Sequence, residues 1–206
     1  MKQVNQNAVS PVIGVMLMLV VTIIIAAVVS GFAGGLIGNS QKIPQATIKG
    51  VFSQSGGMQI IDTGGDTLSG ANLMFTVTND PNFGQGLSTA TTQILAKSII
   101  TDANGNALQN NDGTSSVTSF GLGQTLYINQ SNLNPAILQP QVADQGSSGT
   151  GGYTFTNGVW SSSSPKTDLW KLCFVNPASV GKTFTLTMSD KTSGATIAKT
   201  TVVITA

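Results

Sequence analysis

The sequence predicts an α+β protein, in which a long hydrophobic N-terminal α-helix is followed by an antiparallel, all-β sandwich or barrel-like domain. Three observations support this. No charged residue occurs between Lys2 and Lys42, and most of that span is aliphatic. From Ala46 onward, short β-branched and aromatic runs alternate with turn clusters at roughly 8–12-residue spacing, which is typical of antiparallel sheets. No helical period of useful length appears after residue 45.

The helix is predicted from the length of its apolar run. Val12 to Val29 is aliphatic apart from Gly14 and Thr22. As a helix this stretch would extend ~27 Å, close to the ~30 Å of a bilayer core, whereas residues 8–38 would extend ~46 Å and overshoot it. A helix that is apolar all round must be buried in lipid or among other helices.

The start of this helix has two possible forms. Ser10 could be the N-cap, with Pro11 at the first helical position, where its missing N–H costs nothing. Alternatively the helix begins at Ala8 and Pro11 lies within its first turn, where proline is tolerated.

Small residues recur every four positions towards the end of the apolar segment. One ridge contains Ala26, Ser30, Gly34 and Gly38, and the other contains Ala27, Gly31 and Gly35. Such ridges let neighbouring helix backbones approach closely. The alternative is that these residues only fray the end of the helix.

The strands of the β-domain are predicted from alternation. Thr183 to Met188 places three apolar side chains on one face and threonines on the other. Residues 169–175 alternate in the same way, with Trp170, Leu172 and Phe174 on one face and Lys171 and Cys173 on the other. They are predicted as a strand in which Cys173 is simply a small residue. Residues 92–102 are predicted as a further strand. Residues 99–108 and 187–197 each place an Asp before a Gly-containing turn and predict hairpins.

The composition argues against an enzyme. The chain has eight Asp and nine Lys but no Glu, Arg or His, and its single cysteine is Cys173. A Ser-His-Asp triad, the commonest general base and a Cys-based zinc site are therefore unavailable, and no cofactor or metal site is expected. A net charge of +1 gives no reason to expect nucleic-acid binding. Ser, Thr, Asn and Gln total 75 residues, so the polar surface is mostly neutral.

Three processes could act on the N-terminal segment. A signal peptidase could remove it, with a cut after Ala33, although such apolar regions are usually about 7–15 residues long. A bilayer could retain it as a simple anchor, which fits the length of residues 12–29 but leaves residues 8–13 without a distinct purpose. An assembly apparatus could cut before it and pack it into a polymer.

The third process is supported by a family resemblance. "AVSPVIGVMLMLVVTIIIAAVVSGF", Ala8 to Phe32, resembles the N-terminal segment of archaeal type IV pilins. The resemblance implies that a prepilin peptidase cuts between Asn7 and Ala8. The residues that match the family's mature start are Ala8, Val9, Ser10, Pro11, Val12, Ile13 and Gly14. Two features depart from related patterns: the leader ends in uncharged Gln6-Asn7, and Val12 stands where bacterial type IV pilins have a glutamate.

The resemblance also implies an organisation and a function. Residues 1–7 would be the leader, 8–38 the filament-core or transmembrane helix, 39–45 a linker and 46–206 the outer β-domain. The protein would be the structural subunit of an extracellular, adhesive pilus-like filament at the cell surface. Its partners would be other copies of itself, the prepilin peptidase, the assembly machinery and, before assembly, the membrane.

The alternative function is a membrane-anchored or secreted β-sandwich that binds ligands at the cell surface. Tyr153, Phe155 and Trp160 are its candidate exposed aromatics, unless they belong to the core. Independently, Asn129-Gln130-Ser131 is a sequon for N-glycosylation and is expected in a strand or at a strand edge.

Overall fold

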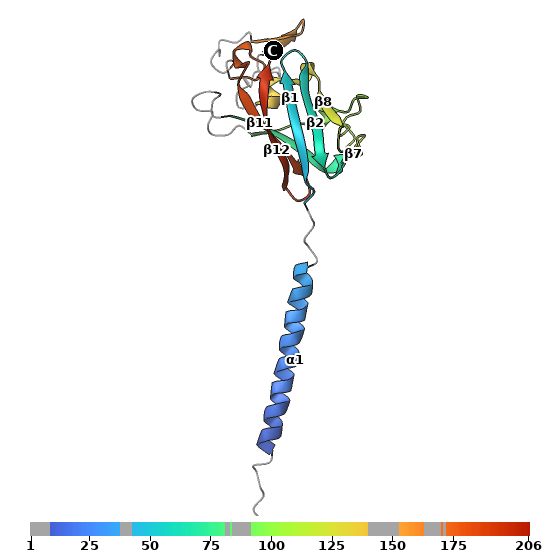
Figure 1. Ribbon diagram of the computed structural model, residues 1–206, viewed down its shortest axis with the longest axis vertical. Helices are drawn as coiled ribbons and strands as arrows, with labels where there is room; N and C mark the ends of the chain where they lie inside the picture. The colour runs from blue at the N-terminus through green and yellow to red at the C-terminus, as the bar shows by residue number, and fades with distance from the viewer. Residues whose placement is uncertain are drawn as a thin grey trace, which may run out of the picture. The chain divides into compact units, whose positions relative to one another are not determined.

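The structure is a computed structural model of the chain, and it describes residues 9–37, 43–80, 83, 92–139, 153–162, 170 and 172–206. The chain divides into two compact units, Met1–Lys42 and Ile43–Ala206, which we describe separately. The first unit contributes a single helix, and the second is largely β-structure (Figure 1).

The β-unit contains twelve strands and one short helix within its described residues. Their bounds are β1 Ala46–Ser53, β2 Gly57–Gly65, β3 Leu68–Ser69, β4 Leu73–Asn79, β5 Thr92–Ile94, β6 Ile100–Thr101, β7 Ser119–Phe120, β8 Thr125–Ile128, α2 Pro135–Leu138, β9 Tyr153–Thr156, β10 Val159–Ser162, β11 Thr183–Asp190 and β12 Thr196–Thr205. Short 3₁₀ helices connect some of them, at Gly70–Asn72, Lys97–Ile99, Gln130–Asn132 and Pro177–Ser179.

The N-terminal helix α1 spans Val9–Ile37, a run of 29 residues. At 1.5 Å per residue it extends ~44 Å. The prediction of one long apolar helix is confirmed; its expected end residues, Ala8 and Gly38, lie outside the described part of the chain.

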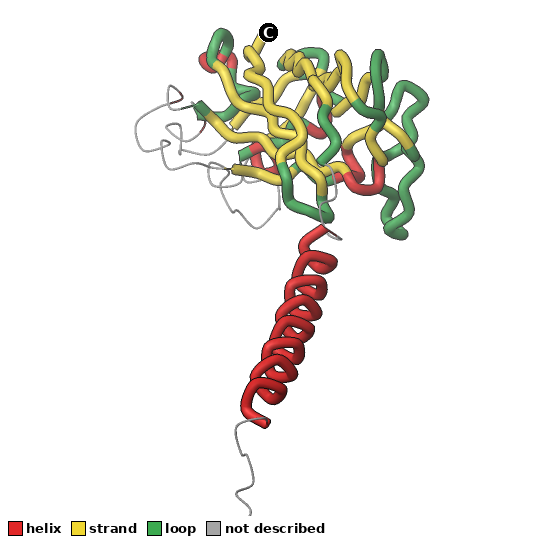
Figure 2. Tube along the Cα trace, turned by 60° about the horizontal axis from the view of Figure 1, so that its bottom comes forward, coloured by secondary structure: helices red, strands yellow, loops and turns green. Residues whose placement is uncertain are grey.

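Eight strands form one curled, mixed sheet in the order β5-β4-β11-β12-β1-β2-β8-β6, which Figure 1 and Figure 2 show as a half-barrel from two directions. Its ladders are antiparallel except between β1 and β12, where Phe52 pairs with Ile204 and Ser53 with Thr205 in parallel register. The expected largely β domain is confirmed, but its purely antiparallel pairing was wrong. β1 and β12, the first and last strands of the unit, therefore lie side by side and run in the same direction. They pair through two residues at the C-terminal end of each strand.

Residues 92–102 do not form the single strand that was predicted. β5 pairs with β4 at one edge of the sheet, whereas β6 pairs with β8 at the other edge. The 3₁₀ turn Lys97–Ile99 separates them. This segment therefore crosses from one edge of the curled sheet to the other, which leaves only short strands at both edges.

The core lies on the concave side of the sheet and follows the predicted alternation. Phe184, Leu186 and Met188 of β11 are fully buried, and β4 alternates buried and half-buried residues along its whole length. The Phe174 ring stacks on that of Phe184 at 4.5 Å between centroids, and Phe52 meets Phe184 edge-on at 5.5 Å. The alternation predicted for β11 is confirmed.

Residues 172–180 form turns, so the strand predicted at 169–175 was wrong. Main-chain hydrogen bonds run from the N–H of Cys173 to Trp170 O and from the N–H of Asn176 to Cys173 O, both 3.0 Å long. The side chain of Gln54, which follows β1, holds this loop in place. Its Nε2 donates to Phe174 O at 2.8 Å and to Asn176 O at 2.6 Å. The four successive residues 173–176 are all buried, and turns and the Gln54 side chain hold them there rather than a β-ladder.

The point where the chain enters the β-unit is fastened by a reciprocal pair of bonds. The N–H of Gln45 donates to Asp66 Oδ2 at 3.1 Å, and the N–H of Asp66 donates to Gln45 O at 2.7 Å. Gly65 permits this approach, because a Cβ there would lie 2.3 Å from Gln45 O and its φ is +116°. Ala46 and the end of β2 are thereby held together.

Candidate functional sites on the helix and the β-unit

The side chains described on α1 are exposed on every side of the helix. From Val12 to Phe32, 21 residues of mean hydropathy 3.2, the large apolar side chains are 47–72% exposed within the chain. The first turn has no acidic residue and the last turn no basic one. This stretch is long and apolar enough to cross a membrane, since ~32 Å of helix matches a ~30 Å hydrocarbon core.

The polar side chain in the middle of this stretch is satisfied by the helix itself. Thr22 Oγ1 donates to Leu19 O at 2.9 Å. In lipid or in a dry helix bundle an unpaired hydroxyl would be costly, and this back-bond removes that cost. Thr22 therefore needs no polar partner from outside the helix.

The start of α1 agrees with the second of the two forms considered. The helix already includes Val9 and Ser10, so Ser10 is not its N-cap. Pro11 is the third helical residue and lies in the first turn, where backbone N–H groups have no partner within the helix. The N-cap interpretation was wrong because the helix already begins at Val9, two residues before Pro11.

The expected assembly segment continues along the same exposed surface. Val12 and Ile13 are 59% and 51% exposed, and a Cβ built on Gly14 would meet nothing within 4 Å in the chain. No contact among the described residues thus requires glycine at this position. The expected cleavage bond, Asn7–Ala8, lies outside the described residues.

The small-residue ridges fall within α1. Ala26, Ala27, Ser30 and Gly31 are exposed, while of Gly34 and Gly35 the structure describes only that they are helical. Ala27 and Gly31, with Val28 and Phe32, line a depression of ≈ 300 Å³ on the helix surface. A Cβ on Gly31 would also meet nothing within 4 Å. Their part in helix packing stays a prediction.

The candidate exposed aromatics of the β-unit mostly belong to its interior. Tyr153 and Trp160 are 3% and 7% exposed, and only Phe155, at 36%, reaches the surface. Tyr153 stacks on Trp170 with 5.1 Å between ring centroids. Of the two alternatives considered, the core position therefore holds for Tyr153 and Trp160, and the three residues do not form an aromatic binding surface.

The sequon lies directly after β8, close to where it was expected. Asn129 is exposed and caps the 3₁₀ helix that follows, since its Oδ1 accepts the N–H and the hydroxyl of Ser131, each at 3.0 Å. These bonds use Oδ1 and leave Nδ2, the nitrogen that a glycan would occupy, at the surface.

The described residues offer neither a metal-binding cluster nor a reactive thiol. They contain no group of three or more His, Cys, Asp or Glu side chains that could bind a metal ion. Cys173 is fully buried, and burial raises the pKa of its thiol to about 12. Such a thiol is inert rather than nucleophilic.

One feature of the β-unit was missed by the sequence analysis. A pocket of ≈ 400 Å³ opens beside β8, with walls from residues 102–104, 116–120 and 123–127. Three segments separated by turns build it from residue types that are common everywhere in this sequence. Of these segments, the sequence indicated only the turn at Asp102, as part of the predicted hairpin at residues 99–108.

Comparison with known proteins agrees with the geometry of the helix. Residues 7–48 match the family described as archaeal type IV pilin, N-terminal. No curated protein and no solved structure matches the chain. The family points to a pilus subunit whose precursor is inserted in the membrane and whose final place is a surface filament. Residues 7–48 therefore match an archaeal type IV pilin N-terminal domain, a family of structural, non-enzymatic proteins.

Proposed function

We propose that this protein is the structural subunit of an extracellular, adhesive archaeal type IV pilus-like filament. A prepilin peptidase removes residues 1–7, and the exposed Ala8 becomes the mature N-terminus. The helix first anchors the subunit in the membrane and then packs with the helices of other copies in the filament core. The β-unit, residues 46–206, forms the outer surface, and residues 39–45 link it to the helix.

The observation that carries this proposal is the all-round exposure of apolar side chains on α1. Fifteen large apolar side chains between Val12 and Phe32 are exposed. Their burial would be worth about 20–45 kcal/mol relative to water, at ~1.5–3 kcal/mol each. Such a surface requires lipid or other helices around it.

The transfer from lipid to filament gains much less, because lipid is as apolar as the side chains. Packing must then decide between the two environments. Gly14 and Gly31 support this step, because no contact among the described residues requires either of them and both would let a neighbouring helix approach the backbone. The depression at Ala27 and Gly31 offers a described position for another helix to pack against.

The processing step is tested by N-terminal mass analysis of filaments and of membrane fractions from the same cells. We expect a mature chain that begins at Ala8 in both. A start at Gly34 would show removal by an ordinary signal peptidase. Met1 retained in a membrane-bound monomer would instead support the anchored binding protein.

The packing step is tested with a matched pair of helix substitutions. Gly31→Leu adds a side chain inside the depression, whereas Val21→Leu enlarges an apolar residue outside both small-residue ridges. We expect both variants to enter the membrane, but only Val21→Leu to yield filaments in electron micrographs. Gly31→Leu filaments in wild-type numbers would remove the role given to the ridge.

The sequon supports a finer proposal, N-glycosylation at Asn129. Its exposure and its position at the end of β8 leave Nδ2 accessible. Intact-mass spectrometry of filaments should show a glycan on the wild-type subunit and none on Asn129→Gln. Equal masses, apart from the substitution itself, would exclude the modification.

A further inference from the structure

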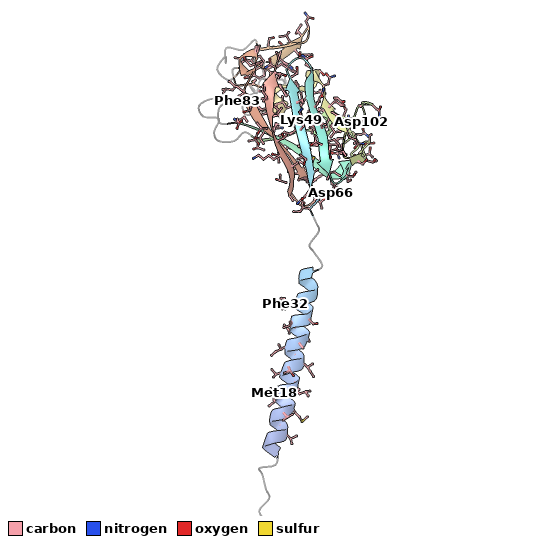
Figure 3. The ribbon with its side chains drawn as sticks, in the orientation of Figure 1. Met18, Phe32, Lys49, Asp66, Phe83 and Asp102 are labelled. Atoms are coloured by element: carbon pink, nitrogen blue, oxygen red, sulfur yellow. The ribbon has the colours of Figure 1, made fainter. Side chains whose placement is uncertain are left out.

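The pocket beside β8 exists because one side of that strand is only half covered. β2 pairs with β8 from Thr125 to Ile128, but on the other side β6 reaches only Tyr127 and Ile128. The chain leaves β6 at Asp102, and no described strand lies next to Thr125 on that side. Figure 3 places Asp102 on the side of the β-unit where Figure 1 labels β8.

The turn at Asp102 is held firmly and forms one rim of the pocket. Asp102 Oδ1 accepts the N–H groups of Asn104 and Asn106, each at 2.8 Å, and Oδ2 accepts Asn106 Nδ2 at 2.9 Å. A carboxylate has about four acceptor positions, so one remains on Oδ2. The rim therefore presents a fixed acceptor with spare capacity.

The lining of the pocket is polar but almost uncharged. Hydroxyl groups come from Ser116, Thr118, Ser119 and Thr125, and amides from Asn104 and Gln124. Val117, Phe120 and Leu126 are buried beneath them. The half-buried ring of Tyr127 closes one side, next to the exposed Gln59, with which it pairs across β2 and β8.

This combination of groups selects among ligand classes. No lysine lines the described pocket, so it lacks the cation that a phosphate or carboxylate would need. Asp102 is its single carboxylate, whereas calcium requires six to eight oxygen ligands, usually with several carboxylates. A neutral ligand with many hydroxyl groups and an apolar face suits hydroxyls, amides, one carboxylate and one aromatic ring. The ≈ 400 Å³ volume lies at the small end of the range of ligand pockets, about 300–1,000 Å³.

We propose that this pocket binds a neutral saccharide, with the Asp102 carboxylate accepting sugar hydroxyls and the Tyr127 ring packing against the sugar face. This inference rests on the proposed adhesive filament, to which it adds a ligand class. Hydrogen bonds from Asn106, first from its side chain and then from its backbone, hold the pKa of Asp102 below its ordinary value. The acceptor thus keeps its charge at neutral and mildly acidic pH.

The test uses the full chain, both as filaments and as subunits in detergent. The probes are immobilised glucose, galactose, mannose and N-acetylglucosamine and their neutral oligosaccharides, followed by titration of the best binder. Ser119→Trp fills the pocket, and Thr201→Trp adds the same side chain to the exposed face of β12 as a control. We expect Ser119→Trp to abolish binding and Thr201→Trp to retain it.

Two further variants address the contacts themselves. Asp102→Asn keeps the shape of the side chain but removes its charge, and it should weaken binding about ten- to a hundred-fold, as for a lost charged hydrogen bond. Tyr127→Ala should also weaken binding while the thermal transition stays near that of the wild type. Unchanged affinity in Ser119→Trp, or no binding of any probe by the wild type, overturns the inference.

Failure of this inference can be told apart from failure of the proposed function. Wild-type filaments that form but bind no saccharide refute the pocket and leave the filament role intact. A subunit that binds saccharide in detergent but never forms filaments refutes the filament role and supports the pocket. Ser119→Trp filaments of normal appearance without saccharide binding support both.

Discussion

Substituting Gly50 by alanine tests how closely the two halves of the curled sheet approach each other. Gly50 lies in the middle of β1 and does not have a positive φ, so alanine brings no backbone strain. A Cβ there would lie 2.4 Å from Val202 Cγ2 of β12 and 3.4 Å from Leu186 Cδ2 of β11. Because Gly50 has no side chain, Val202 can pack against β1 at this point.

The cost follows from the stiffness of the contacting group. Val202 is 1% exposed and β-branched, so its methyl group cannot move aside without an unfavourable χ1 angle or a shift of β12. Overpacking of this kind costs about 1–3 kcal/mol. Alanine would recover part of this, since glycine in a strand is itself unfavourable by roughly 0.5–1 kcal/mol. We expect Gly50→Ala to lower the free energy of unfolding by about 1–2 kcal/mol.

The measurement is thermal and urea unfolding of the full chain in detergent, followed by tryptophan fluorescence. For a unit of this size the midpoint temperature should fall by about 2–8 °C. Gly56→Ala is the matched control, because a Cβ there would meet only Ser53 atoms, at 3.6 Å. Its change should stay within about 0.5 kcal/mol.

A double-mutant cycle with Val202→Ala identifies the source of the effect. Removing the two methyl groups opens space for the new Cβ, so the two substitutions should be less harmful together than their sum, by about 1 kcal/mol or more. Gly50→Ala with wild-type stability would refute the close packing of β1 on β12. Additive losses in the cycle would show that the cost arises elsewhere.

Three further outcomes are expected. Cys173 should resist a maleimide near the ordinary thiol pKa of about 8.5 and react only after unfolding, because burial raises its pKa to about 12; rapid labelling of the folded chain would contradict this. Gln54→Leu should destabilise the β-unit by about 1–3 kcal/mol in urea unfolding, since two carbonyls of the 172–180 loop lose their donor; a change below about 0.5 kcal/mol would show that the loop does not need these hydrogen bonds. Hydrogen bonds from Ser193 hold the folded-state pKa of Asp190 below its ordinary value, so its contribution to the free energy of unfolding is present above about pH 4 and is lost as the pH falls further. Asp190→Asn should therefore make the free energy of unfolding depend less on pH in this acidic range. The same pH dependence in the variant and the wild type would refute the assignment.

The long helix and the alternating strands could be predicted because their signals are local. A charge-free run longer than a bilayer specifies α1 without reference to the rest of the chain, and alternation in β11 specifies which side chains enter the core. The family resemblance at Ala8 to Phe32 rests on equally local residues, and it agrees with the match over residues 7–48.

The errors arose where contacts distant in sequence decide the structure. The apolar alternation at 169–175 predicted a strand, whereas residues 173–176 are buried in succession within turns that hydrogen bonds from Gln54 hold. The parallel pair of Phe52 with Ile204 joins residues at opposite ends of the β-unit, and it has no local signal. Residues 92–102 divide between two edges of the sheet for the same reason.

The pocket beside β8 could not be predicted from composition. Its hydroxyl and amide residues belong to the 75 Ser, Thr, Asn and Gln of the chain, so their type marks no position. What makes the site is the early departure of the chain from β6 at Asp102, which uncovers Thr125. That departure depends on which strand β6 pairs with, and the sequence does not state the pairing.

The position of β1 within the sheet has a mechanical consequence. Tension carried by the chain before Ile43 enters the β-unit through the Gln45–Asp66 clamp and then pulls along β1. All eight residue pairs between β1 and β2 are then loaded together in shear, rather than peeled apart one after another. β12 flanks β1 on its other side, so the strand can leave only by sliding past two neighbours. The strand that receives the load is thus held by residue pairs on both of its sides.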